Sequence, residues 1–154
     1  MFKRIYVDMD GVVADFSLAA TQAGLHPKDF KLVKGVYRAL APIPGAIEAL
    51  EKLHSLGYDI ELATKLPHDN AYSATEKILW VYEHLPWLKG HITITSDKGQ
   101  LGDENDVLID DRPHKANVAG FKGTFIHFGE EGQYKNWSEV IDFLLNVKPD
   151  SLRR

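Results

Sequence analysis

The segment at residues 3–15 constrains the fold more than any other stretch, because a short apolar run ends there at an acid. Residues 5–7 (Ile-Tyr-Val) are typical of a buried parallel strand, and Asp8 follows directly. Asp10 and Gly11 come next, and a glycine permits a turn that wraps the segment around an ion. Taken alone, two acids after a strand are more often ordinary turn residues. Ligands of open α/β sheets bind beyond the carboxyl ends of strands, however, and this position indicates a metal and phosphate site.

Length and composition narrow the class of protein. The chain has 154 residues, which we expect to form a single domain over residues 1–154. It has no cysteine, which excludes a disulfide framework and a thiol nucleophile. The net charge of −4, without a long basic run, argues against binding of a nucleic acid polymer. No run is long and apolar enough for a signal peptide or a membrane span, so we expect a cytoplasmic protein without a membrane partner. The oligomeric state is not predicted.

Hydrophobic patterns predict the remaining elements. Apolar runs indicate four more strands, at residues 58–63, 91–95, 107–109 and 124–128. Helical periodicity indicates helices at residues 12–23, 45–56 and 113–119, and a last helix that Asn136 and Glu139 open as a capping box. The tail at residues 148–154 is expected to fray. The alternation of strands and helices predicts an α/β fold with a doubly wound, parallel, five-stranded Rossmann-like sheet.

Two segments between these elements need separate predictions. Residues 16–41 leave the sheet after the first strand and return before residues 42–45 (Pro-Ile-Pro-Gly), with a break at residues 26–29. We interpret residues 16–41 as a small insert, called the insert below. A long helix capped by Asp69 or Asn70 follows the second strand, and its expected buried stripe is Ala71, Ala74, Ile78, Val81, Tyr82 and Leu85.

Polar side chains follow four separate strands or loops at the same expected edge of the sheet. They are Asp8 with Asp10, Thr64, Lys98, and Asp110 with Asp111. Together they supply a carboxylate nucleophile, an acid/base, a hydroxyl donor, a cation and further carboxylates for a metal. This set of groups is what phosphoryl transfer requires.

The chain resembles phosphatases of the haloacid dehalogenase superfamily and, within it, the 5′(3′)-deoxyribonucleotidase (cytosolic type C 5′-nucleotidase) family. The resemblance covers most of residues 3–146. It rests on Asp-Met-Asp-Gly-Val-Val-Ala-Asp at 8–15, Pro-Ile-Pro-Gly-Ala at 42–46, Thr64, Ser-Asp-Lys at 96–98, and Leu-Ile-Asp-Asp-Arg-Pro at 108–113. It implies a haloacid dehalogenase-like fold in which residues 16–41 form a reduced cap.

The resemblance also implies catalytic roles. Asp8 would attack phosphorus and form an aspartyl phosphate. Asp10 would protonate the leaving oxygen and then deprotonate the attacking water. Thr64 would hydrogen-bond a phosphate oxygen, and Lys98 would neutralise the charge between Asp8 and the phosphate. Lys65, which stands where the family usually has a small hydroxyl residue, either adds a phosphate contact or is solvated.

The same resemblance implies a magnesium ion. Asp8 and Asp111 would ligate Mg²⁺ with their side chains, and Asp10 with its backbone carbonyl. Asp110 would act through water or by positioning Lys98. Four carboxylates and a phosphate repel one another strongly, so both the metal and the lysine would be needed for attack.

The substrate prediction is a small phosphorylated molecule, with a (deoxy)ribonucleoside monophosphate as the leading choice. The insert is much shorter than the cap of the deoxyribonucleotidases, and its aromatic residues Phe16, Phe30 and Tyr37 either stack on a base or form the core of the insert. A phosphatase of another small metabolite is therefore an alternative. A non-enzymatic phospho-receiver and a silent phosphate-binding module are alternatives of a different class.

Overall fold

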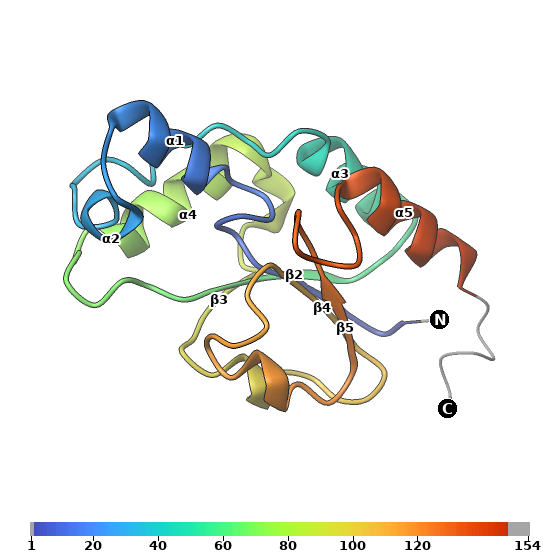
Figure 1. The fold of residues 1–154 in the computed structure, drawn as a ribbon. Coiled ribbons are helices and arrows are strands. Elements are labelled where there is room, and N and C mark those ends of the chain that lie inside the picture. The colour runs from blue at the N-terminus through green and yellow to red at the C-terminus, as the bar shows by residue number, and fades with distance from the viewer. Residues whose placement is uncertain (1, 148–154) are drawn as a thin grey trace.

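The computed structural model describes residues 2–147, so the expected tail at 148–154 lies outside the described residues. Its centre is one sheet of five parallel strands in the order β3-β2-β1-β4-β5 (Figure 1). The strands are β1 (Ile5–Val7), β2 (Ile60–Thr64), β3 (Ile92–Ile94), β4 (Val107–Asp110) and β5 (Thr124–His127). This arrangement confirms the predicted α/β fold with a five-stranded parallel sheet. The chain runs outward from β1 in both directions, so the crevice at the carboxyl end of β1 is the topological switch point.

The α-helices lie over one face of the sheet in Figure 1. They are α1 (Phe16–Ala23), α2 (Pro27–Phe30), α3 (Ala46–Ser55), α4 (Ser73–His84) and α5 (Trp137–Asn146). Three 3-10 helices are shorter: η1 (Pro86–Leu88), η2 (Lys98–Gln100) and η3 (Val118–Gly120). As predicted, Asn136 caps α5, since its side chain accepts a hydrogen bond from the Glu139 N–H. No helix within residues 2–147 meets the length and hydrophobicity that crossing a bilayer requires.

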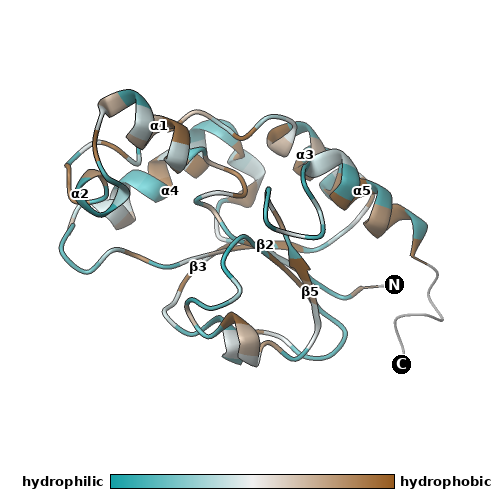
Figure 2. Ribbon diagram, in the orientation of Figure 1, coloured by the Kyte–Doolittle hydropathy of each residue, from teal (hydrophilic) through white to brown (hydrophobic). Residues whose placement is uncertain are grey.

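The two faces of the sheet bury separate sets of apolar side chains because successive strand residues point to opposite faces. Ile5 and Val7 of β1 belong to the large core under the α-helices. Tyr6 between them belongs to a second, smaller cluster with Val118 and Phe121 of the η3 region. Figure 2 shows β5 as hydrophobic and much of the connecting loops as hydrophilic. In the described residues, 3-10 turns rather than α-helices cover this second face.

Several local expectations differ from the structure. The helix expected at residues 113–119 is only the 3-10 helix η3. The break expected at residues 26–29 contains α2, which begins at Pro27, a residue whose fixed φ suits the first position of a helix. The first helix begins at Phe16 rather than at residue 12, because the Asp15 side chain caps it by accepting from the Leu18 N–H.

The prediction for α4 was wrong in its start and only partly right in its stripe, since Val81 and Leu85 are buried, Ala74 and Ile78 are half-buried, and Ala71 is exposed. The helix begins at Ser73 without a side-chain cap, and Tyr82 is exposed. Its buried residues are Ser73, Glu76, Lys77, Trp80 and Val81, which follow the three- and four-residue spacing of one helical face. Two charged residues of this face are therefore turned into the protein.

One of these buried charges, Glu76, attaches the insert to α4. Its two carboxylate oxygens accept hydrogen bonds from the backbone N–H groups of Gly35 and Tyr37, at 3.0 and 3.1 Å. Buried Asn70 makes a second attachment, because its side-chain amide donates to the Lys31 carbonyl at 2.9 Å. The insert is therefore fixed to the sheet domain by two buried polar side chains.

We expect Glu76→Ala to destabilise the protein by about 3 kcal/mol, because the buried N–H of Tyr37 and the part-buried N–H of Gly35 lose a charged acceptor. Urea denaturation measures the free energy of unfolding. In the same variant, the rate of amide hydrogen exchange at residues 31–40 should rise. Glu83→Ala is the matched control on the same helix. Glu83 is exposed, and among the described residues it pairs only with Arg38 and His84 at the surface, so its loss should leave stability nearly unchanged. Equal effects of the two substitutions would contradict this role of Glu76.

Candidate active site

The turn after β1 places the first acids at the centre of the sheet edge. Asp8 follows Val7 and is buried, with 8% of its surface exposed. The N–H groups of Val13 and Ala14 both donate to the Met9 carbonyl, at 2.8 and 2.9 Å, which closes a tight turn. Gly11 within this turn has φ of 83°, and an added Cβ would lie 2.1 Å from Asp111 Oδ2. Only glycine therefore lets this turn approach the second acidic segment.

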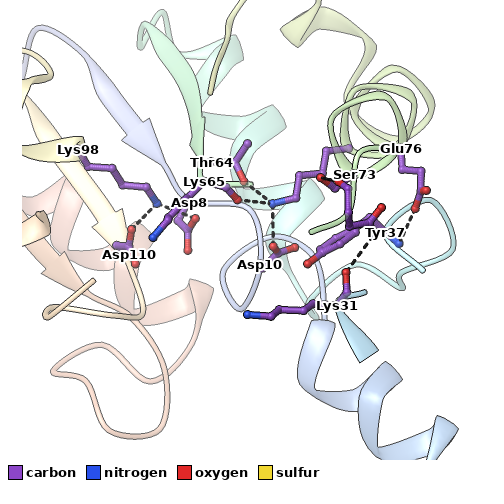
Figure 3. Close-up of polar contacts among 12 residues, drawn as sticks. Asp8, Asp10, Lys31, Tyr37, Thr64, Lys65, Ser73, Glu76, Lys98 and Asp110 are labelled. Carbon is purple, nitrogen blue, oxygen red and sulfur yellow. Dashed lines mark hydrogen bonds and ion pairs between the residues drawn. The ribbon is translucent and has the colours of Figure 1, made fainter. Parts of the chain in front are cut away.

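Lys98 bridges two carboxylates from neighbouring strands. Its Nζ lies 2.8 Å from Asp8 Oδ1 and 2.6 Å from Asp110 Oδ2 (Figure 3). Desolvation lowers the pKa of Lys98, but the charges of Asp8 and Asp110 outweigh it and the pKa is raised above the ordinary value. Lys98 is thus a buried cation that stays charged between two acids.

The backbone around Lys98 is held by a strained loop. The Lys98 N–H donates to the Ala116 carbonyl at 2.7 Å. Ala116 and Asn117 have φ of 50° and 51°, in the left-handed region that costs a residue with a side chain about 1–2 kcal/mol. The Asn117 side-chain amide donates to Asp97 Oδ1 at 2.8 Å, beside Lys98. The loop after β4 therefore fixes the segment that carries Lys98.

Asp8, Asp110 and Asp111 form an acidic cluster that fits a divalent metal ion. One carboxylate oxygen from each lies within 4.8 Å of the other two. Asp111 Oδ1 is buried and has no hydrogen-bond partner within residues 2–147, as expected of an oxygen that a ligand would satisfy. Burial and the charge of Asp8 raise the pKa of Asp111 to about 8 and that of Asp110 to about 6. The carboxylate set suits a hard cation such as Mg²⁺.

The Asp10 side chain is not part of this cluster and contacts a different lysine. Asp10 Oδ2 lies 3.0 Å from the Nζ of Lys77, which also donates to Thr64 Oγ1 and to the Lys65 carbonyl, both at 2.8 Å (Figure 3). Burial raises the pKa of Asp10, and the charge of Lys77 opposes that rise. Asp10 Oδ1 is buried and has no hydrogen-bond partner in the described part of the chain. Lys77 thus uses its three protons to join the ends of β1 and β2.

Lys77 was not predicted as a site residue from the sequence. The spacing of residues on α4 places Lys77 on the buried face of the helix, because it lies three residues before Trp80 and four before Val81, which are both buried. A lysine on the apolar face of a helix needs a partner, and the acid at the neighbouring strand end is that partner. The side chain of Tyr37 also covers Lys77, with its ring centre 4.8 Å from Nζ.

All seven predicted site residues line one cavity of about 620 Å³ at the carboxyl edge of the sheet. They are Asp8, Asp10, Thr64, Lys65, Lys98, Asp110 and Asp111. Phe16, Leu32 and Tyr37 of the insert line it as well. The insert therefore forms one wall of the cavity.

The aromatic residues of the insert pack mainly on one another. Phe16 stacks on Tyr37 with ring centres 5.7 Å apart and meets the edge of Phe30 at 5.3 Å. Only 9% of Phe16 and 3% of Tyr37 are exposed. In this arrangement they form the core of the insert and offer little open face for a base.

Solved structures identify the class of fold. The chain is similar to a HAD-superfamily hydrolase from Ehrlichia chaffeensis, with a TM-score of 0.54 and 14% identity over 94% of this chain and 96% of that one. It is also similar to a hydrolase from Pseudomonas syringae, with a TM-score of 0.60 and 14% identity over 94% and 99%. The protein thus has the fold of the haloacid dehalogenase superfamily.

Sequence relatives identify the family. The human cytosolic 5′(3′)-deoxyribonucleotidase is 31% identical over 143 residues, covering 71% of this chain and 70% of the relative. The mouse mitochondrial 5′(3′)-deoxyribonucleotidase is 30% identical over 144 residues, covering 71% and 64%. Residues 24–149 match the family model described as 5′ nucleotidase, deoxy (pyrimidine), cytosolic type C protein. The chain belongs to this family and is a phosphoric monoester hydrolase.

The raised pKa of Asp111 predicts how pH and magnesium affect stability. Without metal, the folded protein holds this proton more tightly than the unfolded chain, so stability falls as pH rises from the ordinary aspartate pKa to about 8. Magnesium binds the deprotonated acids, so it should raise the melting temperature by about 4 °C above pH 8 and by much less near pH 5. Asp111→Asn should remove this difference. The same magnesium effect at both pH values would contradict the proposed metal site.

Proposed function

We propose that the protein is a magnesium-dependent phosphomonoesterase that hydrolyses (deoxy)ribonucleoside 5′-monophosphates through an aspartyl phosphate on Asp8. The observation that carries this proposal is the convergence of Asp8, Asp10, Lys98 and Asp111 on one cavity. The names of the relatives support a nucleotide as the substrate. In this proposal residues 16–41 act as a reduced cap of a single domain.

In the first step, an oxygen of Asp8 attacks phosphorus, and the bond from phosphorus to the ester oxygen breaks. Lys98 holds Asp8 in place and offsets the negative charge that attack brings together. Thr64, at the end of β2, is available to donate its hydroxyl proton to a phosphate oxygen. A divalent cation held by Asp8, Asp111 and the Asp10 carbonyl would supply electrostatic stabilisation of the phosphoryl oxygens.

Asp10 moves the proton in both steps. In its protonated form it donates to the leaving oxygen, and its raised pKa supports that form. It then takes a proton from the water that attacks the aspartyl phosphate, which releases inorganic phosphate and restores Asp8. Lys77 holds the Asp10 carboxylate and favours its charged form, so we assign Lys77 as a positioning residue.

A substrate panel tests the proposed activity. With magnesium, the purified protein should release phosphate from deoxyribonucleoside and ribonucleoside 5′-monophosphates, and without magnesium it should release little or none. Asp8→Asn should lower kcat by about a thousandfold or more. An unchanged circular dichroism spectrum is the control for an intact fold. No turnover of nucleotides, sugar phosphates or an aryl phosphate would reject the proposal. A stable aspartyl phosphate without turnover would instead indicate a phospho-receiver.

Substitution of Lys77 tests whether this residue positions Asp10 for catalysis or only stabilises the fold. Lys77→Met should raise the pKa of Asp10, so the acidic limb of the kcat–pH profile should move up by about one pH unit or more. Lys77→Arg keeps the charge and should restore most of the profile. The melting temperature reports any structural loss independently. A uniform loss of kcat at all pH values, without movement of the acidic limb, would contradict this role.

A further inference from the structure

The cations of this protein are unevenly placed. Most lysine and arginine side chains among residues 2–147 contact an acid, a carbonyl oxygen or an aromatic ring. Seven have no such contact: Lys28, Lys31, Lys52, Lys65, Arg112, Lys115 and Lys122. Five of the seven line the active-site cavity, in a chain whose net charge is −4. Cations gathered without partners repel one another, so their placement points to an anionic ligand.

These five cations fall into two groups by position. Lys65 follows Thr64 and Arg112 follows Asp111, so both adjoin the strand ends where the scissile phosphate would lie. Lys28 and Lys31 come from the insert, and Lys115 comes from the loop after β4. The second group therefore belongs to the parts of the cavity wall outside the strand ends. We call Lys28, Lys31 and Lys115 the outer cations.

The backbone of the insert is fixed at and beyond Lys31. Lys31 accepts the Asn70 amide at its carbonyl, and Glu76 binds the backbone further along the insert. Figure 3 shows the Lys31 side chain extending from the insert toward the side of the cavity that holds Asp8 and Asp10. Among the residues that line the cavity, one acid lies outside the catalytic set, Asp69. The three outer cations therefore exceed this acid by two charges, which is about the charge of a phosphate dianion.

The insert contributes charged side chains to this cavity rather than exposed aromatic rings that could stack on a base. Phe16 and Tyr37 are buried against each other, so the insert presents lysines rather than open aromatic faces. We propose that the preferred substrate is a phosphomonoester with a second phosphate group, which the outer cations bind while the first phosphate is hydrolysed. This inference rests on the proposed function and narrows its substrate class. A nucleoside bisphosphate and a sugar bisphosphate share this chemistry.

Matched substrate pairs test the inference. With magnesium, kcat/KM for deoxyadenosine 3′,5′-bisphosphate should exceed that for deoxyadenosine 5′-monophosphate by about tenfold or more, the order expected of one charge-assisted contact. The same comparison of kcat/KM for fructose 1,6-bisphosphate and fructose 6-phosphate tests whether a sugar bisphosphate is preferred. A preference in either pair supports the inference, and which pair shows it identifies the source. Equal values within both pairs would overturn it.

Lysine variants test which side chains cause the preference for a bisphosphate over a monophosphate. The triple variant Lys28→Met, Lys31→Met, Lys115→Met should remove the preference and leave the monophosphate rate within about twofold. Lys52→Met and Lys122→Met remove unpartnered cations outside this cavity and should keep the preference. If the triple variant lowers kcat/KM for both members of a pair by the same factor, the outer cations only attract anions, and the inference is wrong.

A binding measurement separates this inference from the proposed function. Calorimetry on magnesium-loaded Asp8→Asn protein should show about tenfold tighter binding of the bisphosphate than of the monophosphate. Turnover of monophosphates by the unsubstituted protein, with equal binding of the two ligands, would overturn the second phosphate site alone. Tighter binding of the bisphosphate with no turnover of any ester would overturn the proposed function alone.

Discussion

The placement of four carboxylates at the centre of one sheet edge is the constraint on which the rest of the structure depends. Asp8, Asp10, Asp110 and Asp111 cannot all be charged in a partly buried crevice without compensating cations. Two buried lysines provide part of that compensation, with Lys98 between Asp8 and Asp110 and Lys77 on Asp10. The remaining negative charge is what makes the site suited to a divalent cation.

Much of the surrounding structure supports these ion pairs. Helix α4 carries both the lysine that contacts Asp10 and Glu76, which attaches the insert. The left-handed pair at residues 116–117 holds the backbone of Lys98. Backbone strain and buried charge both lower stability, and they persist where the surrounding contacts determine the conformation. Here both occur at the proposed catalytic centre, where fixed charges favour reaction.

The sequence predicted the sheet and the acids well because both depend on local patterns. Residues 5–7 and 107–109 are short apolar runs that end in acids, and parallel strands bring their carboxyl ends to one edge. Lys77 and Glu76 were missed because they lie outside the apolar stripe that was expected for α4, and only their distant partners explain their burial. The conformation at residues 116–117 was also missed, since alanine rarely adopts positive φ and Ala116 gives no local signal for it.

The proposed function requires a divalent cation held by the side chains of Asp8 and Asp111 and by the Asp10 carbonyl. Anomalous diffraction from crystals soaked in Mn²⁺, a substitute for Mg²⁺ with the same preference for oxygen ligands, tests it directly. We predict one strong anomalous peak within coordination distance of Asp8 and Asp111, and its loss in Asp111→Asn. A peak elsewhere on the molecule, or none at this cluster, would contradict the account.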